Sequence, residues 1–337
     1  MSSLRTPLIS VLMPVRDGGV DLATAVDSIL GQTLTDIELV IVDDGSTDGA
    51  LDVLQDYGDP RLKLFSNPGR GIVSALNFAA SRAKGRYFAR MDADDIAMPL
   101  RLERQLELLE HDSSIGIVGA EVEIFAGDGD VGEGYRLYQD WINGLRTPQA
   151  IGREMFVESP IPHPTAMLSN SLFQTLGGYR DVPWAEDYDL WLRAHLQGVG
   201  MAKPDGVLLK WRDSEDRLSR ADRRYAMDRF IDAKAHYLAK SQLRNRNAVI
   251  WGAAPTGARL HDALEREGAS TVAFIDVDPK KIGGRKRGRP VLPAAAAAEV
   301  APALIVGAVG SRGARAEIRN ELDGHGMTEG EDYLFAA

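Results

Sequence analysis

Residues 37–48 of the chain read IELVIVDDGSTD, an apolar run that stops at acidic and small polar residues. A run of apolar and β-branched residues without polar alternation is typical of a parallel strand covered on both faces. Residues 8–15, LISVLMPV, have the same character, and apolar side chains recur between the two runs at helical spacing, through Ala25, Ile29 and Leu30. This order of strand, helix and strand predicts an α/β fold with a mainly parallel sheet.

The same alternation continues along the chain in two blocks. In the first, KLFSN (63–67) and RYFARM (86–91) are predicted strands with a helix between them. In the second, the predicted strands are AVIWG (248–252), VAFIDVD (272–278) and ALIVGAV (303–309). The alanine-rich segment 293–303 is predicted to be helical. A chain of 337 residues suits two such domains.

Charge is unevenly distributed between the two blocks. Residues 246–337 carry 12 of the 39 basic and 12 of the 49 acidic residues, so the net charge of −10 lies entirely in the first 245 residues. Apolar residues at helical spacing predict a helical extension over about 215–245, which leads into a junction near Arg244 to Asn247. We therefore expect a domain at 1–245 and a smaller α/β domain at 246–337.

Composition excludes several classes of protein. An acidic chain is a poor partner for the phosphate backbone of nucleic acid. Cysteine is absent, which excludes disulfide scaffolds, thiolate metal sites and cysteine catalysis. No apolar run approaches the roughly 18 residues of a membrane span, and the amino terminus lacks the pattern of a secretory signal. These features predict a cytoplasmic protein without a membrane span.

Acidic residues follow two of the predicted strands in the first domain. Asp43 and Asp44 come after IELVIV, and Asp92, Asp94 and Asp95 come after RYFARM. Ligands of open parallel sheets bind at the carboxyl ends of the strands, so these carboxylates are candidates for a site. At the first strand end, Asp43 or Asp44 either accepts from a nucleoside base or ribose, or caps the next turn, as Ser46 and Asp48 also can.

The second acidic group predicts a cation site. Three carboxylates within four residues repel one another unless a cation neutralises them, and oxygen ligands suit Mg²⁺ or Mn²⁺. A calcium EF-hand loop is excluded, because Ile96 and Ala97 stand where that loop needs an oxygen ligand and a glycine. The alternative is a solvated acidic turn that caps the next helix. Residues 127–130, GDGD, are taken for a surface loop.

A third acidic group stands at the start of a predicted helix. Glu186 and Asp187 precede an aromatic face formed by Tyr188, Trp191 and His195. The dipole at a helix amino terminus favours an ionised carboxylate, which is the form that a general base needs. Capping of the helix is the alternative role for either acid.

The second domain has the outline of a mononucleotide-binding unit. A turn from Gly252 to Gly257 follows AVIWG, and the next strand reaches Asp276. The glycines would let a phosphate approach the helix amino terminus, but the full dinucleotide and P-loop patterns are missing. A scaffold without a ligand is an equal alternative. The basic run 280–289, KKIGGRKRGR, could contact anionic lipid headgroups or a lipid diphosphate, although a solvated loop is favoured.

Four ordered motifs together resemble the inverting glycosyltransferases of family 2, which have the GT-A fold. The motifs span about residues 6–220, and they are LISVLMPVRDG (8–18), AVDSILGQTLTDIELVIVDDGSTDG (25–49), NPGRGIVSALNFAASRAKGRYFARMDADD (67–95) and PHPTAMLSNSLFQTLGGYRDVPWAEDYDLWLRA (162–194). The second domain resembles small Rossmann-like domains attached to sugar-modifying enzymes.

The resemblance implies a role for each matching residue. Asp187 corresponds to the catalytic base and Asp94 to the metal ligand, with Mn²⁺ or Mg²⁺ as the cofactor. The donor-binding residues implied are Pro14, Val15, Arg16, Asp44, Arg70 and Asp92, of which Asp44 would recognise the base and Asp92 would lie near the ribose. Gly252, Gly257 and Asp276 stay candidates for a second nucleotide site.

Two positions depart from the family pattern. The first strand of the family usually ends PxYN, whereas this chain has Pro14-Val15-Arg16-Asp17. The downstream YRxH motif reads Trp211-Arg212-Asp213-Ser214, so Ser214 stands where a histidine near the metal is often found. We therefore expect few protein ligands to the metal. His163 could substitute, but a structural histidine is the favoured interpretation.

The expected function is therefore transfer of a sugar from a nucleotide diphosphate donor, with a UDP-sugar favoured, to a saccharide or lipid-linked acceptor in surface polysaccharide or glycoconjugate assembly. The alternatives are a nucleotidyltransferase that makes sugar nucleotides, a non-catalytic nucleotide-sugar-binding module and, third, an NAD-dependent oxidoreductase. The sugar, the linkage and the oligomeric state are not encoded in any motif that we recognise.

Overall fold

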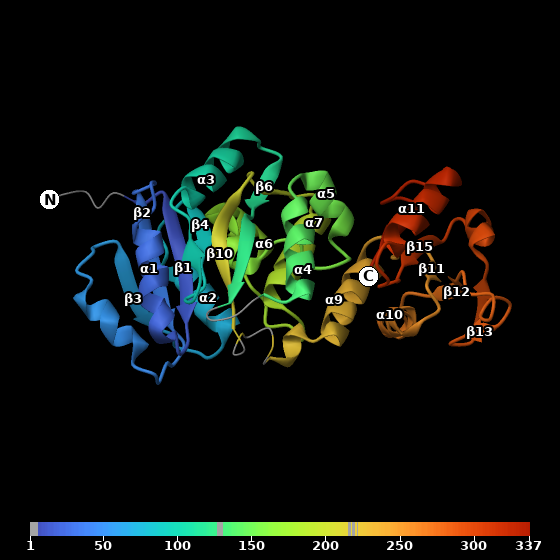
Figure 1. The fold of residues 1–337 in the computed structure, drawn as a ribbon, viewed down its shortest axis with the longest axis horizontal. Coiled ribbons are helices and arrows are strands. Elements are labelled where there is room, and N and C mark those ends of the chain that lie inside the picture. The colour runs from blue at the N-terminus through green and yellow to red at the C-terminus, as the bar shows by residue number, and fades with distance from the viewer. Residues whose placement is uncertain (1–5, 127–130, 215–216, 218–219, 221) are drawn as a thin grey trace. The chain divides into compact units, whose positions relative to one another are not determined.

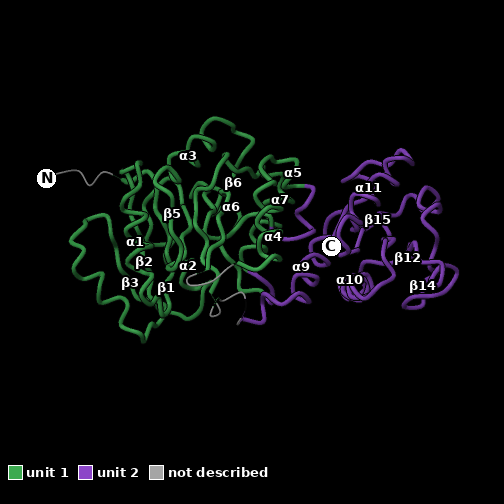
Figure 2. Tube along the Cα trace, in the orientation of Figure 1, with its two compact units in different colours: residues 1–152, 160–182, 186–217 green, residues 153–159, 183–185, 218–337 purple. Residues whose placement is uncertain are grey.

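The structure of the chain is a computed structural model, which describes all residues except 1–5, 127–130, 215–216, 218–219 and 221. The chain forms two compact units (Figure 2). Unit 1 comprises residues 1–152, 160–182 and 186–217, and unit 2 comprises 153–159, 183–185 and 218–337. Two short segments from the middle of the chain therefore belong to the C-terminal unit. The helix Met227–Lys240, which lies within the extension that we expected in the first domain, belongs to it as well.

Unit 1 is built on a seven-stranded sheet of order β3-β2-β1-β4-β8-β6-β9 (Figure 1). Its strands are β1 (Ile9–Val15), β2 (Ile37–Asp43), β3 (Leu62–Ser66), β4 (Tyr87–Arg90), β6 (Ile115–Val118), β8 (Met167–Ser169) and β9 (Gly200–Ala202). All neighbours are parallel except β8, which runs antiparallel to β4 and β6. The predicted mainly parallel α/β sheet is confirmed.

Strand β1 is an interior strand of this sheet, and all seven of its residues are buried. It pairs in parallel with β2 on one side and with β4 on the other, and Ile9 is opposite both Ile37 and Tyr87. The chain order thus changes direction at β1, which creates the kind of edge where α/β sheets bind ligands. The carboxyl ends of β1, β2 and β4 meet there.

Helices and a smaller sheet complete unit 1. The helix α2 (Ile72–Arg82) packs on β1 and β2. The other helices are α1 (Leu22–Leu30), α3 (Arg101–His111), α4 (Glu133–Gly144), α5 (Pro148–Glu154), α6 (Asn170–Leu176) and α7 (Glu186–Leu196), with 3-10 turns at Gly19–Asp21, Ala50–Asp56 and His163–Thr165. The smaller sheet has the order β5-β10-β7, with β5 (Ile96–Ala97), β7 (Glu121–Ala126) and β10 (Val207–Asp213).

Unit 2 contains a six-stranded sheet of order β13-β14-β12-β11-β15-β16. Its strands are β11 (Ala248–Trp251), β12 (Thr271–Ile275), β13 (Arg285–Lys286), β14 (Arg289–Leu292), β15 (Leu304–Gly307) and β16 (Tyr333–Phe335). Its helices are α9 (Met227–Lys240), α10 (Pro255–Arg266) and α11 (Ala314–Gly324), preceded by a 3-10 turn at Arg223–Tyr225. The expected Rossmann-like alternation is present.

The alanine-rich segment is helical, as predicted, but over a shorter range. It forms a 3-10 helix over Ala294–Glu299, with Pro293 at its amino-terminal cap. None of the helices in the described part of the chain has the length and apolarity that a bilayer crossing requires.

Candidate active site

The two aspartates at the end of β2 have different roles. The Asp43 carboxylate accepts from the N–H groups two and three residues further on, at 3.1 and 2.8 Å, so it closes its own turn. The Asp44 carboxylate instead reaches the loop between β3 and α2. It accepts from Asn67 Nδ2 at 2.7 Å and from the Gly71 N–H at 2.9 Å. Asp43 is thus the cap, and Asp44 orders the loop that carries Arg70.

The turn after β4 brings Asp92, Asp94 and Asp95 together. One carboxylate oxygen from each lies within 4.8 Å of the others. Burial, and then the charge of Asp92, raise the pKa of Asp94 to about 6. Asp95 is buried, and burial raises its pKa well above the usual range for an aspartate. The turn therefore gathers three carboxyl groups that are difficult to ionise together.

This cluster fits a divalent cation. Asp95 Oδ1 accepts from the Arg212 N–H at 2.8 Å, but its buried Oδ2 finds no hydrogen-bond partner in the described part of the chain. Three converging carboxylates and an orphaned buried oxygen form a hard oxygen donor set of the kind that Mg²⁺ and Mn²⁺ prefer. Asp92, Asp94 and Asp95 are the residues that would hold the metal.

The buried cation beneath this cluster is Arg90, the last residue of β4. Its guanidinium forms an ion pair with the Asp92 carboxylate, and only 5% of the residue is exposed. Burial alone would lower the pKa of Arg90, but the charge of Asp92 and the hydrogen bond to it, together with Tyr179 and Asp95, outweigh burial, and the pKa is raised. Arg90 thus stays charged inside the protein and orients Asp92.

Two further arginines reach the acid cluster from β10 and the residues after it. Arg212 Nε donates to the Asp94 carbonyl at 2.9 Å, and its Nη2 lies 2.7 Å from Asp21 Oδ1. The Arg217 guanidinium lies over the Trp211 ring, 4.3 Å from its centroid, and its charge lowers the pKa of Asp94 and of Asp95. These two guanidinium groups therefore partly compensate the negative charge of the acid cluster. The histidine that the family often has near the metal is replaced by Ser214 in this chain.

Asp187 lies in the first turn of α7, as predicted, and is half-buried. Its Oδ1 accepts from the Tyr188 N–H at 2.7 Å. The expectation that the helix dipole keeps it ionised is wrong. Burial, and then the charge of Glu186, raise the pKa of Asp187 to about 8, whereas the Tyr188 N–H and Arg90 lower it by less. Desolvation outweighs the dipole at this helix end.

A neutral histidine contacts Glu186, the neighbour of Asp187. His163 Nε2 is 2.9 Å from the Tyr179 hydroxyl, and its Nδ1 is 3.6 Å from Glu186 Oε1. Burial and the charge of Arg90 lower the pKa of His163 well below its usual value. His163 is therefore packed and uncharged, and together with Tyr179 and Glu186 it forms what we call the base-side cluster. Among the described residues, the group that could hold a metal ion consists of Asp92, Asp94 and Asp95 and does not include His163.

The remaining predicted donor residues lie at the same sheet edge or next to it. Pro14 and Val15 are buried in β1, and Arg16 is exposed directly after it. Arg70 is exposed in the loop that Asp44 holds. Their role in donor binding stays a prediction.

In unit 2, the predicted glycines and the acid meet at the ends of β11 and β12. Gly252 has a φ of 122°, and a Cβ on Gly257 would overlap its carbonyl oxygen. The Asp276 carboxylate accepts from the Ala253 N–H at 2.8 Å and from Lys281 Nζ at 3.0 Å. The glycines therefore serve the close approach of α10 to β11, and Asp276 already has protein partners.

Three of the six basic residues of the run 280–289 form ion pairs with acids of unit 2. Arg287 Nη2 lies 2.6 Å from Asp262 Oδ2, Arg289 Nη2 lies 3.4 Å from Glu265 Oε1, and Lys281 Nζ lies 3.0 Å from Asp276 Oδ2. Part of the charge of the run is therefore compensated within the unit, and two of the partner acids lie on α10.

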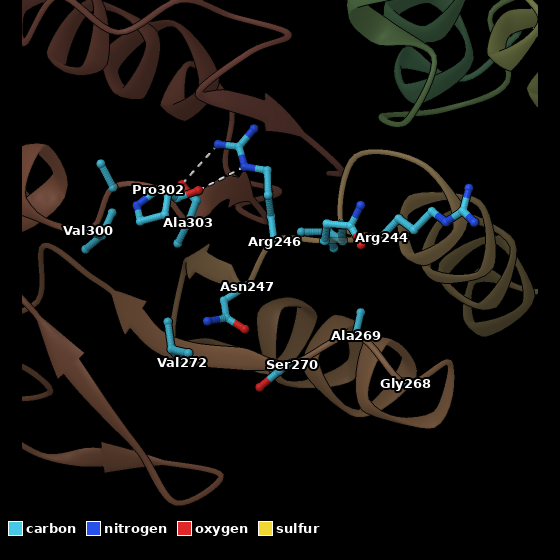
Figure 3. A pocket seen from close by; sticks show the side chains of 13 residues that line it. Arg244, Arg246, Asn247, Gly268, Ala269, Ser270, Val272, Val300, Pro302 and Ala303 are labelled. Carbon is cyan, nitrogen blue, oxygen red and sulfur yellow. Dashed lines mark hydrogen bonds between the residues drawn. The ribbon is translucent and has the colours of Figure 1, made fainter.

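A cavity of about 490 Å³ lies at the opposite end of the same sheet, where β11, β12 and β15 begin (Figure 3). Arg246 crosses it and donates to the Pro302 carbonyl at 2.9 Å and the Glu331 carbonyl at 2.6 Å. Because ligands of parallel sheets bind at the carboxyl ends of the strands, we assign no chemistry to this cavity.

Comparison with known proteins identifies the family. The family model described as glycosyl transferase family 2 matches residues 10–177. The glycosyltransferase EpsE of Bacillus subtilis (strain 168) is 32% identical over 234 residues, which are 67% of this chain and 80% of EpsE. The chain belongs to glycosyltransferase family 2. A second family 2 relative, the O-antigen biosynthesis glycosyltransferase WbnJ of Escherichia coli, is 33% identical over 55% of this chain and 71% of its own.

Solved structures confirm the GT-A fold of this family 2 chain. TarS of S. aureus in complex with UDP-GlcNAc has a TM-score of 0.56 at 17% identity, over 77% of this chain and 71% of that one. The mannosyltransferase PcManGT of Pyrobaculum calidifontis, in complex with GDP-Man and Mn²⁺, has a TM-score of 0.51 at 21% identity, over 79% of this chain and 74% of that one. The chain is a glycosyltransferase, and the nucleotidyltransferase, binding-module and oxidoreductase alternatives are set aside.

Three arginines near the acid cluster were not among the predicted site residues. Arg90 was part of a quoted strand, but nothing in the sequence indicates that its side chain faces inward. Arg212 was quoted only as part of the motif 211–214, and Arg217 follows that motif, so neither was linked to the aspartates, which lie more than 100 residues earlier in the chain. Glu186 was named with Asp187, but its contact with His163 depends on tertiary structure.

Proposed function

We propose that this glycosyltransferase transfers a sugar, with inversion and with the help of Mn²⁺ or Mg²⁺, from a nucleotide diphosphate donor to an acceptor hydroxyl. The observation that carries the proposal is the position of Arg90. Its charge lowers the pKa of Asp94 in the acid cluster and of Asp187 on α7. A candidate metal group and a candidate base are therefore both within electrostatic range of one buried cation, which supports a single site that uses both.

The acid cluster would serve the leaving group. A cation held by Asp94, with Asp92 and Asp95 beside it, would stabilise the negative charge that develops on the departing diphosphate. Arg90 fixes the Asp92 carboxylate, and Arg212 fixes the turn through the Asp94 carbonyl. The protein then needs no separate acid to protonate the leaving group.

Asp187 would serve the attacking group. The acceptor hydroxyl oxygen attacks the anomeric carbon, the bond from that carbon to the diphosphate oxygen breaks, and its electron pair leaves with the diphosphate. The hydroxyl proton passes to the ionised Asp187 carboxylate. One displacement from the face opposite the leaving group inverts the anomeric centre. A base with a pKa near the working pH is well matched to this task.

The donor would lie along the edge formed by β1, β2 and β4. Asp44 would accept from the base, Pro14, Val15 and Arg16 would flank it, Arg70 would contact the donor from its loop, and Asp92 would lie near the ribose. A UDP-sugar is favoured, and the UDP-GlcNAc complex of TarS supports this choice at the level of the fold, whereas the GDP-Man complex supports the GDP alternative.

The acceptor would be a saccharide or a lipid-linked saccharide in surface polysaccharide or glycoconjugate assembly. The O-antigen relative supports this role. A cytoplasmic location and a second nucleotide site at Gly252, Gly257 and Asp276 both stay predictions.

A donor panel tests the proposal. Release of the nucleoside diphosphate is measured with UDP-, GDP- and dTDP-sugars, and release of CMP is measured with CMP-sugars. Each donor is tested with and without Mn²⁺, together with simple saccharide acceptors. Asp187→Asn should abolish turnover and keep donor binding, whereas Asp94→Ala should weaken Mn²⁺-dependent donor binding. Asp140→Asn, an exposed change on α4, is the control. Undiminished turnover in Asp187→Asn would refute the assignment of the base.

A further inference from the structure

Two segments that belong to unit 2 lead directly into the base-side cluster. Residues 153–159 immediately precede the Pro160–His163 segment, and residues 183–185 immediately precede Glu186 and Asp187 (Figure 2). His163 and Glu186, the first cluster residues after each segment, approach each other to 3.6 Å. Both chain paths to the base therefore start from residues that pack in the C-terminal unit.

The segment 183–185 is held through Trp184. This side chain is buried, and its ring centroid lies 5.1 Å from that of His236 and 6.4 Å from that of Tyr237, both on α9. His236 is itself fixed, because its Nδ1 lies 3.0 Å from Glu267 Oε2 and its Nε2 lies 2.8 Å from Lys240 Nζ. Trp184 thus packs against a side chain that has little freedom to move.

The segment 153–159 is held through a buried lysine. Lys234 Nζ, on α9, donates to the Val157 carbonyl at 2.7 Å and to the Ala336 carbonyl at 3.1 Å. Only 5% of Lys234 is exposed, so these carbonyls replace water around the ammonium group. A lysine is costly to bury, and here it ties the segment to both α9 and the C-terminal end of the chain.

An ion-pair network adds a second attachment for this segment. Arg153 Nη2 lies 2.5 Å from Glu329 Oε2, and Arg319 Nε lies 2.9 Å from the same oxygen. Arg319 Nη2 is also 3.6 Å from Glu154 Oε1. Glu329 and Glu154 are largely buried, with side chains 12% and 14% exposed, so solvent screens these pairs less than a surface pair.

We propose that the C-terminal unit is a positioning scaffold for the catalytic base, and that Trp184 and Lys234 are its two positioning residues. The inference rests on the proposed role of Asp187. Trp184 fixes the start of α7 three residues before Asp187, and Lys234 fixes the segment that leads to His163. The unit would then contribute to turnover without contacting the substrate, and donor binding, which depends on β1, β2 and β4, would be independent of it.

The test compares Trp184→Ala with the conservative Trp184→Phe. Misplacement of a catalytic group by about 1 Å can cost on the order of 10²-fold in rate. We expect Trp184→Ala to lower kcat by about 10²-fold. The nucleotide used for binding is UDP or GDP, whichever the wild type binds more tightly with Mn²⁺. Its Kd should change by less than about twofold, because Trp184 lies outside the donor site. Trp184→Phe keeps an aromatic ring against His236 and should restore most of the turnover.

Controls separate positioning from general loss of stability. Val291→Ala removes buried apolar surface from β14 without touching either segment, so it should lower the melting temperature and keep wild-type kcat. Lys234→Met should act like Trp184→Ala. Wild-type turnover in Trp184→Ala, an equal loss of turnover in Trp184→Phe, or a parallel loss of nucleotide affinity would overturn the proposal. Asp187→Asn is measured beside them, because activity in that variant would overturn the proposed function instead.

Discussion

The guanidinium of Arg90 forms an ion pair with the carboxylate of Asp92 from inside the core of the transferase unit. The arginine closes strand β4 and the aspartate opens the acidic turn that follows it. A strand residue therefore supplies the fixed positive charge on which the acid cluster is built. The same charge lowers the pKa of Asp187, so one buried side chain acts on both candidate halves of the site.

Arg90→Met should impair both the cluster and the base. Loss of the guanidinium leaves the carboxylates without their buried counter-charge, and the pKa values of Asp94 and Asp187 should rise further. We expect a loss of about 1–3 kcal/mol in the free energy of unfolding, because Asp92 is partly exposed and can regain water. Chemical denaturation at pH 7 measures this loss. Arg90→Lys keeps the charge and should lose less; equal stability of all three proteins would contradict the role of the charge.

Asp94→Asn should stabilise the metal-free protein and abolish its response to Mn²⁺. The folded-state pKa of Asp94, about 6, lies above the usual aspartate value of 3.8, so ionisation of Asp94 destabilises the fold as pH rises through this interval. The asparagine cannot ionise and removes that penalty. Thermal melts at pH 7 with EDTA and with Mn²⁺ check both effects. If Mn²⁺ raised the melting temperature of Asp94→Asn as much as that of the wild type, the cation would have to bind elsewhere.

Turnover should increase with pH up to about 8. The pKa of Asp187 is raised to about 8, so the base is largely protonated at pH 6 and becomes competent as the proton leaves. The pH profile of kcat/KM reports groups of the free enzyme and is the measurement of choice. A profile that is flat between about pH 6 and 9 would exclude a base with this pKa.

His163→Phe should leave metal affinity unchanged. His163 is neutral and buried, and its nitrogens face Tyr179 and Glu186 and not the three aspartates. Loss of the hydrogen bond to Tyr179 should cost about 1–2 kcal/mol of stability. Calorimetric titration with Mn²⁺ and UDP decides the matter: a tenfold weaker metal affinity would restore the histidine as a ligand.

The fold could be predicted further from the sequence than the site. Continuous apolar runs such as residues 9–15 specify buried parallel strands, and acids directly after them mark the carboxyl edge, so Asp44, Asp92 and Asp94 could be chosen as candidates by position alone. Asp187 needed the resemblance, because an acid at a helix start is more often a cap. The direction of its pKa shift was predicted wrongly. The sequence pattern indicates where the helix begins, and therefore the effect of the dipole, but it does not indicate how deeply the carboxyl group is buried.

Tertiary contacts account for what the sequence could not predict. The sequence does not show on which face of the sheet the Arg90 side chain lies, and only the structure shows that it pairs with Asp92. Trp184 was quoted within the motif of Asp187, yet it packs on α9, about 50 residues further along the chain. Composition put a boundary at residue 245, whereas the segments 153–159 and 183–185 pack with the C-terminal unit.

Gly257→Ala should destabilise the C-terminal unit, although the same substitution in an exposed helix interior stabilises by about 1 kcal/mol. Gly257 lies in the first turn of α10, and a Cβ there would overlap the carbonyl oxygen of Gly252. The strand and helix must then separate, which costs about 1–3 kcal/mol or more. Gly324→Ala is the matched control, because Gly324 ends α11 in the same unit and its Cβ would meet nothing within 4 Å. Differential scanning calorimetry should show a lower melting temperature for the first variant and an equal or higher one for the second; the reverse order would mean that α10 does not approach β11 as closely as the glycines require.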